Sequence, residues 1–237
     1  MYYLKPGSQG LRKLEADHIF FPEHEIAADW ANRDIYEKSL IEWVRDSIVN
    51  EKSECIDIGA HCGTYTLEMA QKAKRVHSFE CSPKTFNYLC ANVALRGLHD
   101  VVTPYNVALG AACGTIPYYI RSIDGGGNGC TQFQKDTWAN TPSIQLPVKT
   151  LDSYGFTGVN FIKIDVEGHE QQVIEGGKKM LEENDYPTIL FESWTEDMEQ
   201  QGIPAIKLRE DLFETLGSLE YRISNIDQYP QMFIAGR

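Results

Sequence analysis

Short apolar runs alternate along the chain with longer segments in which apolar residues recur every three or four positions. The short runs predict buried strands, and the longer segments predict amphipathic helices. The expected strands cover residues 55–60, 75–80, 101–109, 160–167, 187–193, 221–226 and 232–236, and the expected helices cover residues 35–49, 64–73, 82–97, 170–184 and 205–217. Strands and helices that alternate in this way indicate an α/β protein with a mostly parallel sheet and helices on both faces.

One segment interrupts this alternation. Residues 115–121 and 144–151 look extended, and between them lies the glycine-rich stretch "DGGGNG" at 124–129. We expect an added hairpin whose glycine loop either closes over a substrate or is only an exposed connection. The 237 residues otherwise fit one globular unit, in which residues 1–50 form a helical lead-in and residues 51–237 form the main domain.

Composition and charge narrow the range of partners. The chain carries 22 basic and 34 acidic residues, a net charge of −12, which repels phosphate backbones and argues against nucleic acid as a partner. No apolar run approaches the roughly 20 residues of a membrane span, and the N-terminus lacks the pattern of a signal peptide, so we expect a cytoplasmic protein. The six cysteines form no C-x-x-C pair, which favours reduced thiols over zinc ligands.

Polar residues stand where the predicted parallel strands end: Asp57, Glu80, Asn106, Asp165 and Glu192. The carboxyl ends of parallel strands meet at one edge of the sheet, and ligands of such folds bind beyond that edge. We therefore expect these side chains to converge on one site.

The first strand runs into "DIGAHCG", which places Asp57, Gly59 and Gly63 around a tight turn. Glycine is needed where backbone bends sharply or where a ligand approaches closely. Glu80 ends the second strand, where a carboxylate can accept both hydroxyls of a ribose. NAD and S-adenosylmethionine both suit these signals, but the glycines do not follow G-x-G-x-x-G, and Asp57 would repel a pyrophosphate. The pattern favours S-adenosylmethionine, and a plain turn without a ligand is the alternative.

Several segments, taken in order, resemble the FkbM-type methyltransferases: "CIDIGAHCGTYT", "FECSPKTFNYLCANV", "NVALG", "VKTLDSY", "FIKIDVEGHEQQVIEGG" and "PTILFES". The resemblance covers roughly residues 36–192, and "KIDVEGHE" is its most specific part. It implies the Rossmann-like class I methyltransferase fold, with a seven-stranded sheet of order 3-2-1-4-5-7-6 and an antiparallel last strand. It also implies transfer of a methyl group to a hydroxyl oxygen, usually on a sugar or polyketide.

By position, the resemblance also implies the cofactor site. The methionine and ribose region would be lined by Asp57, Gly59, Ala60, His61 and Gly63. His61 stands where the family more usually has asparagine, so an imidazole that fills the turn is favoured over a catalytic one.

The remaining cofactor contacts that the resemblance implies lie after later strands and before the first one. Glu80 would hold the ribose with Cys81 and Ser82 beside it, and Asn106 and Val107 would lie near the adenine. Tyr36 and Glu37 resemble a tyrosine–glutamate pair that faces the cofactor in these proteins.

The acceptor end is predicted at "FIKIDVEGHE", residues 161–170. Alternation along the strand would place Lys163, Asp165 and Glu167 on one side. Asp165 would face the cofactor as well. An attacking alcohol must lose its proton, so Asp165, Glu167 and His169 are the candidate bases. Lys163 is a further candidate, but a buried ion pair that fixes the acids is the favoured explanation for it.

Each of these residues also has a purely structural explanation. Asp165 would cap the following helix or pair with Lys163, Glu167 would complement the helix dipole, and His169 would be an exposed first-turn residue. In a metal-assisted alternative, Asp165 and Glu192 would hold one Mg²⁺ that lowers the pKa of a bound hydroxyl.

The sequence therefore predicts an S-adenosylmethionine-dependent O-methyltransferase acting on a hydroxyl of a sugar or glycan. A polyketide, a lipid or another small molecule is the alternative acceptor. An alternative of another class is a cofactor-binding module without turnover, which serves a larger glycan-assembly protein. Acids at both ends of the site argue against such a module.

Overall fold

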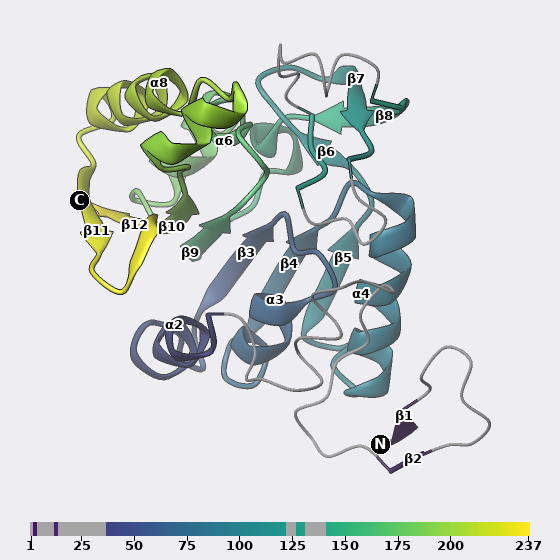
Figure 1. Cartoon of the computed structure of the whole chain (residues 1–237). Coiled ribbons are helices and arrows are strands. Elements are labelled where there is room, and N and C mark those ends of the chain that lie inside the picture. Colours follow the sequence, from purple (N-terminus) through teal and green to yellow (C-terminus); the bar gives the residue numbers. More distant parts are fainter. Residues whose placement is uncertain (1, 4–11, 14–36, 122–126, 131–140) are drawn as a thin grey trace.

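The computed structural model describes residues 2–3, 12–13, 37–121, 127–130 and 141–237. Its centre is a seven-stranded sheet (Figure 1) of order β11-β12-β10-β9-β3-β4-β5. These strands are β3 (Glu54–Ile58), β4 (Arg75–Phe79), β5 (Val102–Tyr105), β9 (Val159–Ile164), β10 (Thr188–Glu192), β11 (Arg222–Ile226) and β12 (Tyr229–Gly236). All neighbours pair in parallel except β12, which runs antiparallel to β10 and β11. In chain order this is 3-2-1-4-5-7-6, so the predicted α/β fold and strand order are confirmed.

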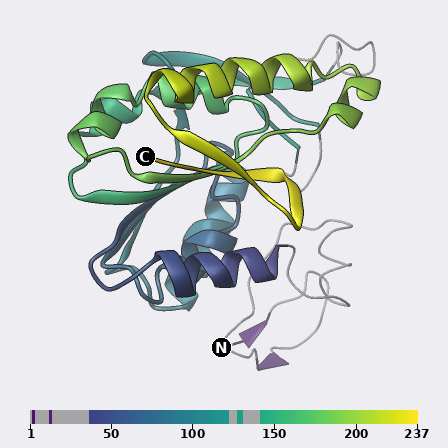
Figure 2. The ribbon, with the colours of Figure 1, turned by 90° about the vertical axis from the view of Figure 1, so that its left-hand side faces the viewer.

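Helices cover both faces of the sheet (Figures 1 and 2). One face carries α2 (Lys38–Trp43), the π-helical turn η1 (Val44–Ile48), α3 (Thr64–Met69) and α4 (Pro83–Leu95). The other face carries α6 (Glu170–Glu175), α7 (Lys178–Glu183) and α8 (Ala205–Ser218). Each layer forms its own apolar core with the sheet. Within the described residues, every helix is too short or too polar to cross a lipid bilayer.

Strand β9 shows how sequence alternation sets these two cores. Ile162 and Ile164 pack in the core under α6 and α8, whereas Phe161 packs in the core under α3 and α4. Lys163 follows the parity of Phe161 and is 3% exposed. The predicted alternation therefore holds along β9, and it directs one buried ammonium toward the α3 side.

A second, three-stranded sheet lies beside the main one. It has the order β6-β8-β7, with β6 (Ala108–Leu109), β7 (Gly114–Tyr119) and β8 (Ser143–Lys149). β7 and β8 pair antiparallel, which confirms the expected hairpin. The expected single strand over 101–109 was wrong: β5 ends at Tyr105, and β6 joins the small sheet. Pro104 in β5 lacks a backbone N–H and so favours the sheet edge where β5 lies.

The expected helix over 170–184 was also wrong, because Gly176 and Gly177 divide it into α6 and α7. A Cβ on Gly176 would lie 2.0 Å from the carbonyl oxygen of Gly110. The chain after β6 therefore presses directly on this backbone. By contrast, α4 follows its prediction: Pro83 is in its first turn, and Ser82 caps it by accepting a hydrogen bond from the amide of Thr85 (3.3 Å).

Two parts of the lead-in, residues 1–50, are described in the structure: a short strand pair and a helical segment. β1 (Tyr2–Tyr3) pairs antiparallel with β2 (Arg12–Lys13). Leu40, Ile41 and Val44 pack in the same core as α3 and α4. The division of the chain at residue 50 stays a prediction. Two short 3₁₀ helices, η2 (Leu151–Tyr154) and η3 (Glu196–Gln201), complete the described elements.

Candidate active site

The carboxyl ends of the parallel strands lie at one edge of the sheet (Figure 1). The predicted polar residues are located at or just after these strand ends. Asp57 and Lys163 are register partners on β3 and β9. The backbone amide of Asp165 continues this pairing with a hydrogen bond to the carbonyl of Ile58 (3.0 Å). The first and fourth strands in chain order therefore bring the two halves of the predicted site into contact.

Asp57 is fully buried where β3 approaches the turn. Its Oδ2 accepts a hydrogen bond from the Thr66 hydroxyl (2.5 Å), which comes from α3. Its Oδ1 has no hydrogen-bond partner and lies 3.8 Å from the Lys163 ammonium. Burial raises the pKa of Asp57, although Lys163 and Thr66 oppose that shift. The sequence analysis did not identify Thr66 as a site residue, because only the fold brings its hydroxyl next to Asp57.

The turn after β3 has no room for a side chain at its first glycine. Gly59 has a φ of +76°, and a Cβ there would lie 1.7 Å from the carbonyl oxygen of Asp165. The amides of Gly59 and Ala60 both donate to the carbonyl of Phe79, which fixes the turn against β4. Gly63 also has a left-handed backbone, with a φ of +101°. The glycines at these two positions are therefore required by geometry.

Glu80 lies at the end of β4, 7% exposed, and is held by backbone amides. The amide of His61 donates to its Oε2 (2.9 Å), and the amide of Ser82 donates to its Oε1 (2.8 Å). Burial raises the pKa of Glu80 to about 7, against the effect of these amides. Each oxygen keeps a second acceptor position, so the carboxylate can still receive two hydroxyls. His61 contributes through its backbone, in a left-handed conformation with a φ of 52°.

The neighbours of Glu80 differ in what they offer a ligand. Asn106 is exposed, and its amide donates to the carbonyls of Glu80 (2.8 Å) and Cys81 (3.1 Å), so it joins the ends of β4 and β5. Cys81 forms a side-chain hydrogen bond with Cys130. Val107 is 7% exposed and packs in the core under α6. A contact of Val107 with adenine stays a prediction.

Tyr36 lies outside the described residues, whereas Glu37 precedes α2 with a φ of 57°. The Tyr65 hydroxyl donates to Glu37 Oε2 (2.8 Å). Burial raises the pKa of Glu37, and the nearby charge of Asp165 adds to that shift. Tyr65 was missed by the sequence analysis, because only the fold brings α3 next to Glu37.

Lys163 joins both halves of the site. Its ammonium donates to the carbonyl of Gly59 and to Asp165 Oδ2, both at 3.2 Å, and lies 5.1 Å from the centre of the Tyr65 ring. Burial alone would lower the pKa of Lys163, but the surrounding acids outweigh it and raise that pKa. Lys163 is therefore charged and acts as the buried ion-pair partner of Asp57 and Asp165. The structure brings Asp165 to Lys163 and not to a helix cap: α6 begins at Glu170, its N-cap residue is His169, and no side chain makes a capping hydrogen bond there.

Asp165, Glu167 and Glu192 form a carboxylate cluster at the acceptor end. Each can offer an oxygen that lies within 4.8 Å of those of the other two. Burial and then the charge of Asp165 raise the pKa of Glu167 to about 8, and the same causes raise the pKa of Glu192 well above its usual value. The cluster therefore holds protons at neutral pH that ordinary glutamates release.

The glycine-rich loop contacts this cluster through its described residues. The amide of Gly127 donates to Glu167 Oε1 (3.0 Å). A Cβ on Gly129 would lie 2.9 Å from the Cβ of Glu167 and 3.4 Å from Arg121 Nη1. Glu167 itself has a φ of 57°. Glu167 is thus part of a loop contact and does not belong to the first turn of α6.

Glu170 and His169 occupy different surroundings. Glu170 is 6% exposed, and its Oε1 accepts from the amides of Val166 (3.0 Å) and Gly168 (3.2 Å), which closes the loop after β9. His169 lies against Gly110, where a Cβ would be 3.3 Å from its Nε2. Burial lowers the pKa of His169 to about 4, so the ring is neutral at pH 7. His169 is half-buried, which corrects the expectation of an exposed residue, and it is absent from the carboxylate cluster.

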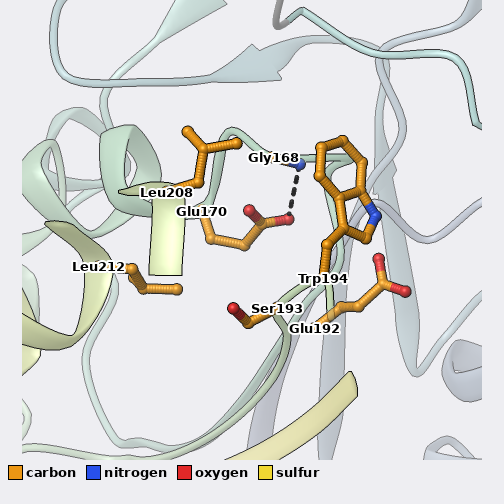
Figure 3. A pocket seen from close by; sticks show the side chains of 7 residues that line it. All are labelled: Gly168, Glu170, Glu192, Ser193, Trp194, Leu208 and Leu212. Atoms are coloured by element: carbon orange, nitrogen blue, oxygen red, sulfur yellow. Dashed lines mark hydrogen bonds between the residues drawn. The ribbon is translucent and has the colours of Figure 1, made fainter. Parts of the chain in front are cut away.

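A small pocket opens beside Glu192 (Figure 3). It is lined by Gly168, Glu170, Glu192, Ser193, Trp194, Leu208 and Leu212. Figure 3 shows the Trp194 ring and the two leucines on opposite sides, with the hydrogen bond between Glu170 and Gly168 between them. The pocket therefore combines apolar walls with carboxylate oxygens.

These residues fit S-adenosylmethionine. The turn at Gly59 is too tight for a side chain, Asp57 Oδ1 is a buried acceptor without a hydrogen bond, and Glu80 has free acceptor positions. The same edge could hold a cation through Asp165, Glu167 and Glu192.

Comparison with known proteins agrees with this geometry. The Methyltransferase FkbM domain model matches residues 57–223. Hexuronic acid methyltransferase AglP of Haloferax volcanii is 26% identical over 163 residues, which cover 68% of this chain and 65% of AglP. The chain thus spans less than two thirds of the length of this relative.

Solved structures share the fold at low sequence identity. The methyltransferase FkbM of Methylobacillus flagellatus has a TM-score of 0.54 and 14% identity, over 82% of this chain and 46% of that one. The O-methyltransferase of Bacillus cereus, solved in complex with S-adenosylhomocysteine, has a TM-score of 0.52 and 15% identity, over 89% and 84%. The family match covers well over half of the sequence. The chain belongs to the FkbM family of S-adenosylmethionine-dependent methyltransferases.

Proposed function

We propose that this chain transfers a methyl group from S-adenosylmethionine to a hydroxyl oxygen of a sugar or glycan. The observation that carries the proposal is the contact between the two halves of the site: the Asp165 carbonyl lies against Gly59, and the Asp165 carboxylate belongs to the acid cluster. A cofactor bound at the Gly59 turn would therefore lie next to groups that can accept a proton. The sugar relative AglP supports the acceptor class.

Bound S-adenosylmethionine would supply an electrophilic methyl group on a sulfonium. Glu80 would receive the ribose hydroxyls, and Asp57 with Lys163 would order the turn that holds the methionine portion. Most of the acceleration would come from holding the acceptor oxygen in line with the methyl carbon and the departing sulfur. Tyr65 and Glu37 would support this wall of the site.

Glu167 is the proposed general base. Its raised pKa, about 8, makes its carboxylate a stronger proton acceptor than an ordinary glutamate. The acceptor oxygen would form its bond to the methyl carbon while its proton passes to Glu167, and the sulfur would leave as a neutral thioether. Asp165, held by Lys163, would orient the hydroxyl and is the alternative base.

A metal-assisted route is the second candidate mechanism. Asp165, Glu167 and Glu192 could together hold one Mg²⁺, a hard cation that prefers carboxylate oxygens. The metal would then lower the pKa of the acceptor hydroxyl directly. We favour the route without metal, because Lys163 already pairs with Asp165 and the Gly127 amide already donates to one oxygen of Glu167.

The remaining expectations concern the acceptor, turnover and location. A polyketide, a lipid or another small molecule is the alternative acceptor, and a binding module within a larger glycan-assembly protein is the alternative without turnover. A cytoplasmic location and the absence of a nucleic-acid partner rest on sequence and charge.

Calorimetric titration with S-adenosylhomocysteine and, separately, with NAD would test the cofactor. We expect micromolar binding of S-adenosylhomocysteine alone. Binding of NAD, or of neither ligand, would overturn the proposal.

Turnover of a panel of methyl glycosides would test the chemistry. Glu167→Gln is expected to lower turnover by roughly 10²- to 10⁴-fold while affinity for S-adenosylhomocysteine stays within threefold. The exposed Glu182→Gln is the matched control and should leave both unchanged. Loss of cofactor affinity in Glu167→Gln would contradict a role confined to proton transfer.

A further inference from the structure

Two cysteines from distant segments meet beside the proposed ribose end of the site. Cys81 follows β4 directly after Glu80, and Cys130 is the last residue of the described stretch 127–130. A side-chain hydrogen bond joins the two thiols. Both are free and half-buried, so each keeps some access to solvent.

The stretch 127–130 is held by hydrogen bonds from the end of β7 and from the residues just after it. The Tyr119 amide donates to the carbonyl of Gly129 (2.9 Å). The Arg121 guanidinium donates to the carbonyl of Gly127 (3.0 Å). The backbone that carries Cys130 is therefore fixed by contacts other than that of its thiol.

The backbone that carries Cys81 is fixed in the same way. The Asn106 side chain donates to the carbonyl of Cys81 (3.1 Å). Tyr118 on β7 is 4% exposed and forms a side-chain hydrogen bond with Ser82, the residue after Cys81. The hairpin that holds Cys130 is thus also attached beside Cys81. Two cysteines can form a disulfide only where their backbones already bring the sulfur atoms together, and this pair meets that condition.

The surroundings give the two sulfurs different reactivity. The hydrogen bond from Cys81 lowers the pKa of Cys130, and the charge of Arg121 adds to that shift. Burial and Glu80 oppose it. The hydrogen bond to Cys130, burial and Glu80 all raise the pKa of Cys81. Because the thiolate is the nucleophile in thiol–disulfide exchange, Cys130 is the sulfur that attacks first.

We propose that Cys81 and Cys130 form a modification site, at which a small-molecule disulfide such as oxidised glutathione converts the two thiols into a reversible disulfide. Cys130 gives its proton to solvent and attacks one glutathione sulfur, which forms a mixed disulfide and releases one glutathione thiolate. The Cys81 thiol gives its proton to that thiolate and attacks the Cys130 sulfur. The second glutathione thiolate leaves and takes a proton from solvent. Two protein thiols are thereby oxidised and one glutathione disulfide is reduced.

The new bond would lie inside the proposed cofactor site. The Ser82 amide holds the Glu80 carboxylate (2.8 Å), which is the proposed ribose ligand. Gly127, in the same stretch as Cys130, donates to Glu167 at the acceptor end (3.0 Å). Bound cofactor should therefore cover the thiol pair and slow its oxidation. This coupling rests on the proposed function, whereas the exchange chemistry of the two thiols does not.

Peptide mapping of the whole chain tests the site. The protein is incubated in mixtures of oxidised and reduced glutathione, and the remaining thiols are blocked before digestion. We expect one predominant crosslinked peptide, which joins Cys81 to Cys130 and disappears in reduced glutathione alone. A different predominant pair would overturn the inference. Free thiols at both positions while the exposed Cys113 carries glutathione would overturn it as well.

Single substitutions separate the two roles. Cys81→Ser should leave Cys130 as a stable mixed disulfide with glutathione, because the second thiol is gone, whereas Cys130→Ser should leave Cys81 largely unmodified. Cys113→Ser, which removes an exposed thiol beside Thr150, is the matched control and should form the crosslink at the parental rate. Equal modification of the remaining thiol in the first two variants would overturn the assigned order of attack.

The cofactor product tests the coupling. Saturating S-adenosylhomocysteine should slow formation of the crosslink by about threefold or more, because access to the sulfurs limits exchange. An unchanged rate in protein that binds S-adenosylhomocysteine would overturn the coupling to the cofactor site. A protein that forms the crosslink yet binds no S-adenosylhomocysteine in calorimetry would instead contradict the proposed function and leave the modification site standing.

Discussion

Asp57 and Lys163 face each other across adjacent parallel strands, both almost completely buried, with 3.8 Å between the carboxylate and the ammonium. The distance is longer than a hydrogen bond, and Lys163 gives its shorter contacts to Asp165 and to the Gly59 carbonyl. One ammonium thus balances two acids from two strands. Lys163 therefore connects the turn at the cofactor end of the site with Asp165 at the acceptor end.

Removing this cation should destabilise the fold. Lys163→Met leaves Asp57 and Asp165 without their counter-charge, and breaking a buried pair on one side costs about 3–5 kcal/mol. Urea unfolding should report this loss. Lys179→Met, which breaks only an exposed pair with Glu183, should stay within about 1 kcal/mol of the parent. The double variant Asp57→Asn/Lys163→Met should recover part of the loss, and a fully stable Lys163→Met would show that the acids are held neutral.

The stability of the ligand-free protein should fall as pH rises through neutrality. Glu167 in the folded state has a pKa of about 8, against about 4.3 in an unfolded chain. The folded state therefore binds protons that the unfolded state has released, so its advantage is complete below about pH 4.3 and is lost as pH passes 8. The pKa of Glu80, about 7, acts in the same direction.

From pH 7.0 to 8.5, Glu167 alone should lower the free energy of unfolding by about 1 kcal/mol. The half-buried His169, whose pKa is lowered to about 4, affects stability only at lower pH, since the ring is neutral in both states above its unfolded pKa of about 6.5. Urea titrations at the two pH values measure the slope. Glu167→Gln should flatten it and the exposed Glu182→Gln should not; a flat slope in the parent protein would count against a protonated cluster.

Gly59→Ala should prevent normal closure of the cofactor turn. The new Cβ would overlap the Asp165 carbonyl at 1.7 Å, so the cost should exceed the roughly 1–2 kcal/mol of a left-handed residue alone. Gly217→Ala is the matched control, because nothing lies within 4 Å of its Cβ position inside α8. That change should stabilise the protein by roughly 0.5–1 kcal/mol. Thermal unfolding of both variants separates the close contact from a general effect of alanine.

The hydrogen bond between Tyr65 and Glu37 should couple α3 to the lead-in. A double-mutant cycle with Tyr65→Phe and Glu37→Gln should give a coupling free energy of roughly 0.5–1.5 kcal/mol in urea unfolding. Glu37→Gln should also weaken binding of S-adenosylhomocysteine about tenfold, or about 1.4 kcal/mol, if Glu37 faces the cofactor as proposed. Unchanged affinity in both variants would assign the pair to folding alone.

Removing divalent metal ions with EDTA should leave the turnover of the enzyme nearly unchanged. If Glu167 accepts the proton without a metal, turnover in EDTA should stay within twofold of turnover in Mg²⁺. A larger loss that Mg²⁺ restores would instead support the metal-assisted route through Asp165, Glu167 and Glu192. If Mg²⁺ did not restore turnover in Glu192→Gln, Glu192 would be identified as a metal ligand.

Much of this fold was predictable because its signals are local. The alternation in β9 directs Ile162 and Ile164 to one core and Phe161 to the other, whatever the rest of the chain does. The cap of α4 at Ser82 and the glycine turn after β3 likewise depend on a few adjacent residues. These elements, with their order along the chain, were enough to predict a parallel sheet and its ligand-binding edge.

Other features depended on contacts that no local pattern records. A Cβ on Gly176, at the end of α6, would lie 2.0 Å from the carbonyl oxygen of Gly110. The two residues are far apart in the sequence, so no local pattern shows this close approach. The same holds for Tyr65 with Glu37, and for Gly127 with Glu167, which are pairs from distant segments.

The sequence by itself therefore determined the α/β fold, the strand-end acids and the family, because periodicity and short motifs act over a few residues. The tertiary structure alone decided which acids share a cluster, which of them Lys163 neutralises and how far their pKa values move. Burial and Coulomb energy depend on all neighbours in space at once. For that reason, the chemistry of Glu167 became visible only when β9, β10 and the glycine-rich loop were brought together.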